Sequence, residues 1–185
     1  CHGYNHKHII DAMHNQLDIM PHVMFGGLTH EPALKLSSRL ASILPGKKSS
    51  KALTHIFFSD SGSVAIEVAL KMATQYWLNL GEPNRNRFVC FKNAYHGDTI
   101  GAMSVCDPDD GMHAIFKGAI PEQIITEIPN SIKKFKEFEK LLEVNGRNIA
   151  GLIIEPLVQA AGGLKFHDTE ILFSKNFVLK LSLPS

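Results

Sequence analysis

The sequence predicts an α/β fold in which a mostly parallel sheet is flanked by helices. Short β-prone apolar stretches alternate with longer amphipathic stretches, which is the pattern of such folds. The chain has 185 residues, of which 44% are hydrophobic and 20% are charged, so one sizeable core is possible. The net charge is +1 and the charged residues are spread without blocks of like charge, so the sequence shows no basic patch that would bind nucleic acid or an anionic membrane. We therefore expect a small-molecule partner.

Residues 1–48 are predicted to form a helical segment that leads into a larger domain. Apolar residues at helical spacing predict a helix over 5–20, with Asn5 as its cap. A loop follows, and Pro32 then opens a second helix that continues to Pro45-Gly46.

Residues 49–171 are predicted to form part of the larger domain. Its first strand is expected at Thr54–Phe58, which is short, apolar and β-prone. A turn over Asp60–Ser63 precedes a helix that runs to about Trp77. The remaining strands are predicted over Arg87–Phe91, Ile124–Ile128 and Ile149–Ile154, and the remaining helix over Ser131–Asn145 with Gly146 as its C-cap.

The strongest local feature is the turn before the helix that ends near Trp77. Glycine lets the backbone turn closely, and a helix N-terminus presents free N–H groups to an anion, so Gly62 and Ser63 are candidates to bind a phosphate. The alternative is that Ser61 or Ser63 only caps the helix. The turn has neither the Walker pattern nor the Gly-x-Gly-x-x-Gly pattern, so a monophosphate suits it better than a nucleotide.

Three further candidates follow the strand over Arg87–Phe91, at the edge where α/β sheets bind ligands. Tyr95 can stack on a flat ring or simply pack, and His96 is either an acid or base or an ordinary hydrogen-bonded histidine. Asp98 can bind a substrate amine or close a turn. Glu155 lies just beyond the last predicted strand, where it either contacts a cofactor or makes hydrogen bonds at the strand end.

Together these motifs resemble the class III aminotransferases of fold type I. In that family a Gly-Ser pair at a helix start holds the phosphate of pyridoxal 5'-phosphate (PLP), and a Tyr-His-Gly loop supplies an aromatic that stacks on its ring. The resemblance covers about residues 1–166. Segments 22–30, 95–99 and 103–108 resemble, more narrowly, the members that aminate 8-amino-7-oxononanoate.

The resemblance implies PLP as cofactor, bound by Gly62, Ser63 and Tyr95. It also implies that Tyr95 and Asp98 contact the substrate, with His96 and Glu155 as possible supporting residues, and no metal site. The implied reaction takes an amino group from S-adenosylmethionine and gives it to 8-amino-7-oxononanoate, which forms 7,8-diaminononanoate in biotin biosynthesis. Members of the family are homodimers.

The family also uses a lysine that binds PLP covalently, and none of Lys165, Lys175 and Lys180 follows the strand that precedes it in the family. We therefore expect this chain to be a fragment without the catalytic lysine, inactive alone. The resemblance fades near 171, and residues 172–185 are interpreted as a divergent tail caused by truncation or a frame shift.

Other classes of protein remain open at this point. The chain resembles, less closely, class III aminotransferases that act on ω-amino acids, and a non-catalytic phosphate-binding module would also lack the lysine. A metal protein is disfavoured because no His-Glu-x-x-His or Cys-x-x-Cys spacing occurs. The three cysteines show no paired pattern, which favours a reducing compartment such as the cytoplasm. The sequence shows no signal segment and no apolar run long enough to span a bilayer, so we expect a soluble protein.

Overall fold

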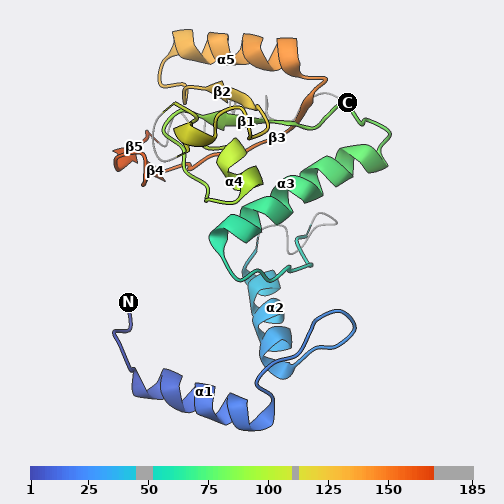
Figure 1. Cartoon of the computed structure of the whole chain (residues 1–185), viewed down its shortest axis with the longest axis vertical. Coiled ribbons are helices and arrows are strands. Elements are labelled where there is room, and N and C mark those ends of the chain that lie inside the picture. Colours follow the sequence, from blue (N-terminus) through green and yellow to red (C-terminus); the bar gives the residue numbers. More distant parts are fainter. Residues whose placement is uncertain (45–51, 110–112, 169–185) are drawn as a thin grey trace. The chain divides into compact units, whose positions relative to one another are not determined.

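The computed structural model describes residues 1–44, 52–109 and 113–168, and the chain divides into two compact units, Cys1–Phe57 and Phe58–Ser185 (Figure 1). The expected break at Pro45-Gly46 and the tail over 172–185 lie outside the described residues. Within the described part, no helix is long and apolar enough to cross a bilayer.

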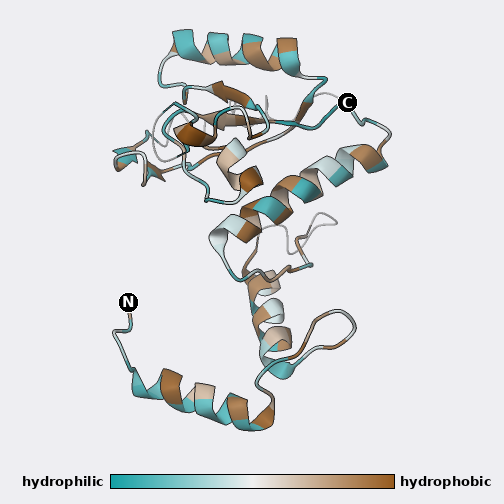
Figure 2. Cartoon of the chain, viewed as in Figure 1, coloured by the Kyte–Doolittle hydropathy of each residue, from teal (hydrophilic) through white to brown (hydrophobic). Residues whose placement is uncertain are grey.

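The first unit contains two amphipathic helices, α1 (Lys7–Ile19) and α2 (Glu31–Ile43), as predicted. The cap expected at Asn5 is wrong: His6 occupies the N-cap position, and Asn5 has a left-handed φ of 57°. In α2 the His30 side chain accepts a hydrogen bond from the Ala33 N–H at 3.2 Å. Ala33 is the only buried residue of the two helices, so most of each apolar stripe in Figure 2 is exposed.

The second unit is built on a parallel three-stranded sheet, which confirms the predicted fold class. Its strands are β1 (Arg87–Phe91), β2 (Ile124–Thr126) and β3 (Ile149–Leu152), in the order β2-β1-β3. β2 and β3 each end two residues before the predicted end. A short antiparallel pair that was not predicted, β4 (Val158–Gln159) and β5 (Lys165–Phe166), follows the sheet.

Helices cover both faces of the sheet (Figure 1). One face packs against α5 (Ile132–Asn145), whose Phe138 and Leu142 join the apolar side chains of the three strands. The other face packs against α3 (Gly62–Asn79), with α4 (Ile100–Ser104) beside that helix. A single turn of 3-10 helix, η1 (Ala114–Phe116), lies between α4 and β2 in the sequence.

Trp77 fixes α3 to the sheet where the ladder is irregular. The pairing of β1 with β3 shifts register so that Arg87 pairs with Ile149 but Phe88 pairs with Gly151, which leaves Ala150 as an extra residue on β3. The Trp77 indole N–H donates to the Ala150 carbonyl at 2.7 Å. The carbonyl next to the irregularity is therefore satisfied by a side chain.

The strand predicted at Thr54–Phe58 is wrong. This segment has no regular secondary structure and forms no β-ladder within the described ranges, and Phe57 is 68% exposed. A strand is completed by hydrogen bonds to a neighbouring strand, so a β-prone composition alone does not produce one.

Candidate cofactor-binding site

The N-terminus of α3 presents unbonded backbone donors. Ser61 is the N-cap, and its Oγ accepts from the Val64 N–H at 3.2 Å. Gly62 and Ser63 form the first turn, and their own N–H groups make no hydrogen bond with any described residue. A Cβ placed on Gly62 would meet no atom within 4 Å, so the space around it is open. This end of α3 therefore offers directed donors and the positive end of a helix dipole to an anion.

The loop after β1 lies against this helix end because Gly97 permits close approach. Gly97 has φ of 131°, and a Cβ on it would come within 2.2 Å of the Ser63 Oγ. The next residue, Asp98, donates its backbone N–H to that oxygen at 3.2 Å. Ser63 therefore does not cap α3 but joins the helix to the loop, and its hydroxyl proton stays available to a ligand.

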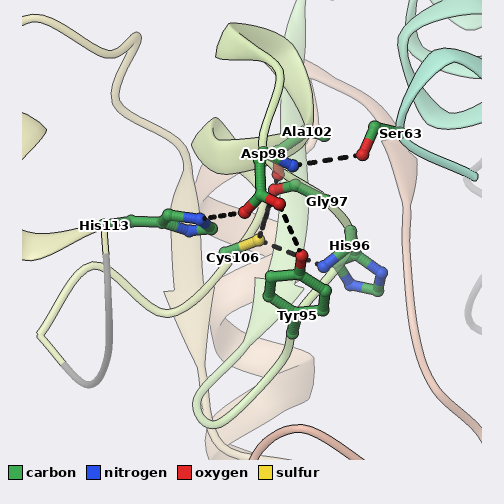
Figure 3. A network of polar contacts seen from close by, with 8 residues as sticks. All are labelled: Ser63, Tyr95, His96, Gly97, Asp98, Ala102, Cys106 and His113. Atoms are coloured by element: carbon green, nitrogen blue, oxygen red, sulfur yellow. Dashed lines mark hydrogen bonds and ion pairs between the residues drawn. The ribbon is translucent and has the colours of Figure 1, made fainter.

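Tyr95 and Asp98 form a hydrogen-bonded pair beside the helix end (Figure 3). The Tyr95 hydroxyl donates to Asp98 Oδ2 at 2.9 Å, and His113 Nε2 lies 2.8 Å from Oδ1. The bonds from His113 and Tyr95 hold the pKa of the Asp98 carboxyl below its usual range. The bond to Asp98 in turn raises the pKa of the Tyr95 phenol. The Asp98 side chain is 65% exposed, so a charged carboxylate faces solvent next to a neutral phenol.

Glu155 holds the Tyr95 loop by hydrogen bonds to the backbone. It follows β3, and its carboxylate accepts from the Tyr95 N–H and from the Ala160 N–H, both at 3.0 Å. This matches the alternative in which Glu155 makes hydrogen bonds at the end of the strand. Tyr95, Asp98 and Glu155 thus lie together at the carboxyl edge of the sheet, as expected for residues that follow parallel strands, and the start of α3 joins them through the bond from Asp98 to Ser63.

His96 points into the protein. Its ring Nε2 is buried and has no hydrogen-bond partner in the described part of the chain, and burial lowers the pKa of the imidazole. Its backbone N–H donates to the Cys106 Sγ at 3.1 Å. His96 is therefore neutral at pH 7.

Sequence reasoning missed His113. This residue lies 15 positions after Asp98, in a loop with no motif of its own, and no helical or strand spacing links the two. Only the fold brings its ring to the Asp98 carboxylate.

The donors and the aromatic ring fit an aromatic phosphate ester. Free N–H groups and a serine hydroxyl suit the phosphate, and the half-buried Tyr95 ring suits a flat heterocycle. Comparison with known proteins gives the family of the chain. The family profile of the class-III aminotransferases matches residues 1–175, and the chain belongs to that family.

The relatives specify the member that the chain resembles. The chain is 44% identical over 176 residues to the adenosylmethionine-8-amino-7-oxononanoate aminotransferase of Corynebacterium glutamicum. This match covers 92% of this chain and 40% of that protein. It is 43% identical to the Mycobacterium leprae protein of the same name, with 92% of this chain and 39% of that protein covered. The chain thus spans about two fifths of the length of these relatives.

Solved structures agree with this comparison. The adenosylmethionine-8-amino-7-oxononanoate aminotransferase of Methanocaldococcus jannaschii superposes with a TM-score of 0.81 at 30% identity, over 97% of this chain and 38% of that chain. An amine transaminase from an uncultivated Pseudomonas species, in its PLP-bound form, superposes with a TM-score of 0.75 at 31% identity, over 88% of this chain and 39% of that one.

Proposed function

We propose that this chain supplies the phosphate-binding and ring-binding part of a PLP-dependent aminotransferase that transfers an amino group from S-adenosylmethionine to 8-amino-7-oxononanoate. One observation carries the proposal: Ser63, in the first turn of α3, is hydrogen-bonded to Asp98, which is itself bonded to Tyr95. A helix N-terminus, an aromatic ring and an exposed carboxylate therefore meet at one sheet edge. The name shared by the curated relatives supports the choice of reaction.

In this proposal the backbone donors of Gly62 and Ser63, with the Ser63 hydroxyl, bind the phosphate of PLP. The Tyr95 ring packs against the pyridine ring and excludes water from it. When bound, PLP supplies the electron sink for amino-group transfer. The Asp98 carboxylate attracts the ammonium groups that both substrates carry, because it stays ionised at neutral pH.

We further propose that this chain alone does not turn over. Covalent binding of PLP needs a lysine at the cofactor carbonyl. The Lys165 ammonium, in β5, donates to the Asn93 side-chain oxygen and is held there. Lys175 and Lys180 lie outside the described residues. By analogy with the family, the working enzyme is a homodimer. The three unpaired cysteines of this chain suit the reducing cytoplasm.

The phosphate site is tested by titrating the purified chain with PLP and following cofactor absorbance. We expect reversible binding that inorganic phosphate displaces, and an affinity at least about tenfold lower for Ser63→Asp, because its carboxylate would repel the phosphate. Ser42→Asp on the exposed surface of α2 is the matched control and should bind PLP as the wild type does. Equal binding by Ser63→Asp would overturn the assignment.

The lack of turnover needs a separate experiment. The chain is incubated with PLP, trapped with borohydride and mapped by mass spectrometry, and 7,8-diaminononanoate is assayed in parallel. Scattered labelling below one equivalent and no product are expected. Stoichiometric labelling of one lysine together with product would show that this chain holds a complete site.

A further inference from the structure

His113 is a buried histidine that belongs to none of the sequence motifs. Its side chain is 8% exposed, and its Nε2 lies 2.8 Å from Asp98 Oδ1. Its ring also stacks on Tyr95, with the centroids 5.8 Å apart and the planes 22° from parallel. One side chain therefore contacts both Tyr95 and Asp98, and Figure 3 shows its hydrogen bond to Asp98.

The direction of the hydrogen bond follows from its partner. An ionised carboxylate only accepts, so His113 Nε2 carries the proton and donates. The backbone of His113 is fixed as well, since its carbonyl accepts from the Phe116 N–H at 2.9 Å where η1 begins. His113 is thus a fixed donor.

Asp98 needs such a donor because little else holds its side chain. The carboxylate is 65% exposed, so packing restrains it little. The two oxygens are bound by different groups, Oδ1 by His113 and Oδ2 by Tyr95. With both oxygens bound, the two hydrogen bonds restrict the orientation of the carboxylate, while the side chain remains accessible to a ligand.

We propose that His113 is a positioning residue, which holds the Asp98 carboxylate and the Tyr95 phenol in a single arrangement for ligand binding. Preorganisation of this kind reduces the entropy that binding must remove. The ring stacking also assigns the two faces of Tyr95: His113 packs on one face, and a ligand ring approaches the other. That these groups serve a cofactor and an amino substrate rests on the proposed function, whereas the hydrogen-bonded arrangement itself does not.

Two substitutions separate the hydrogen bond from the bulk of the side chain. His113→Leu fills similar space without a donor, and His113→Gln places an amide N–H near the position of Nε2. The readout is the Tyr95 phenol, observed by NMR after labelling the tyrosine ring carbon next to oxygen. Only three tyrosines occur, and Tyr95→Phe identifies the signal.

In the wild type we expect the Tyr95 signal to titrate above the ordinary tyrosine range, because Asp98 accepts its proton. His113→Leu should release the Asp98 carboxylate, so that the titration midpoint of Tyr95 falls to the ordinary tyrosine value of about 10. His113→Gln should retain most of the upward shift. An unchanged midpoint in His113→Leu would overturn the proposal.

Folding is monitored in the same samples through the single tryptophan. The Trp77 indole N–H, bonded to the Ala150 carbonyl, gives one resolved signal that is lost if the second unit unfolds. If His113→Leu loses this signal, the decision rests on His113→Gln, which must keep the raised Tyr95 midpoint.

PLP titration of the same variants distinguishes the two hypotheses. A wild-type chain that does not bind PLP but shows the Tyr95 shift and its loss in His113→Leu would refute the proposed function and leave the positioning role intact. PLP binding by the wild type together with an unchanged Tyr95 midpoint in His113→Leu would support the proposed function and refute the positioning role.

Discussion

Gly97 lies where the loop after β1 meets the start of α3. Two properties of the site require glycine there: φ is 131°, and a Cβ would approach the Ser63 Oγ to 2.2 Å and its Cα to 2.9 Å. The contact is to backbone and to a short side chain, which cannot move away without shifting α3. Gly97 therefore determines how near the Asp98 N–H comes to Ser63.

We predict that Gly97→Ala lowers the free energy of unfolding by about 2–5 kcal/mol, which sums the backbone strain and the cost of the overlap. Gly81→Ala is the matched control, because Gly81 has φ of 80° but open space around its Cβ position. It should cost only the strain of about 1–2 kcal/mol. Urea unfolding followed by circular dichroism measures both, and equal losses would mean that the approach to Ser63 imposes no constraint.

Some residues of the site can be predicted from the sequence, and others cannot. Gly62, Ser63, Tyr95 and Asp98 could be singled out because each lies at a strand end or a helix start, where local pattern predicts exposure to a ligand. His113 could not, since its contact with Asp98 arises from the path of the loop that contains η1.

At the scale of elements, the start of α3 combines a stability role with a binding role. Ser61 caps the helix through its Oγ, while the next two residues leave their N–H groups unbonded. The start of α5 has the same cap, with the Ser131 Oγ accepting from the Lys134 N–H at 3.3 Å, but belongs to no candidate site. The two helices therefore allow the roles to be separated.

We predict that Ser61→Ala and Ser131→Ala each lower the free energy of unfolding by about 1 kcal/mol, whereas Ser61→Asp and Ser131→Asp retain stability because aspartate also caps. Only Ser61→Asp should weaken PLP binding, by roughly tenfold, since its charge lies beside the phosphate site. Urea unfolding and PLP titration of the four variants test this. A comparable loss of PLP affinity in Ser131→Asp would point to a non-specific charge effect.

Prediction succeeded for the long helices and failed for Thr54–Phe58 because the two kinds of element differ in what completes them. The hydrogen bonds of α1, α2, α3 and α5 are local, so spacing and caps identify them. A strand takes its hydrogen bonds from another part of the chain, and no described strand pairs with Thr54–Phe58. β4 and β5 escaped prediction because each has only two residues.

At the scale of the whole molecule, the sheet buries Cys90 in its central strand, β1. This side chain is fully buried, and burial raises the pKa of the Cys90 thiol to about 12. In the unfolded chain the pKa of a cysteine thiol is about 8.5. The folded state thus keeps a proton that the unfolded state releases, so the stabilisation is complete below about 8.5 and is lost as pH rises toward the folded value.

We predict that the free energy of unfolding decreases above about pH 9, with Cys90 contributing up to about 1.4 kcal/mol per pH unit. Cys90→Ala should be less stable at pH 7 because it leaves a cavity, but its decrease at alkaline pH should be shallower than that of the wild type. Cys1→Ala, at an exposed position, should behave as the wild type does. Parallel alkaline slopes for wild type and Cys90→Ala would contradict the burial of a protonated thiol.

β1 lies between strands that follow it in the sequence, and this order has a consequence for synthesis on the ribosome. Tyr95 is bonded to Glu155, 60 residues later, and Trp77 to Ala150, 73 residues later. At about 5–20 residues per second, the nascent chain waits roughly 3–15 s between these partners, with the apolar faces of β1 and α3 uncovered. Assembly of the site is therefore a long-range step that waits for residue 155, and chaperone binding or codon choice between residues 95 and 155 should affect the yield of folded chain more than changes elsewhere.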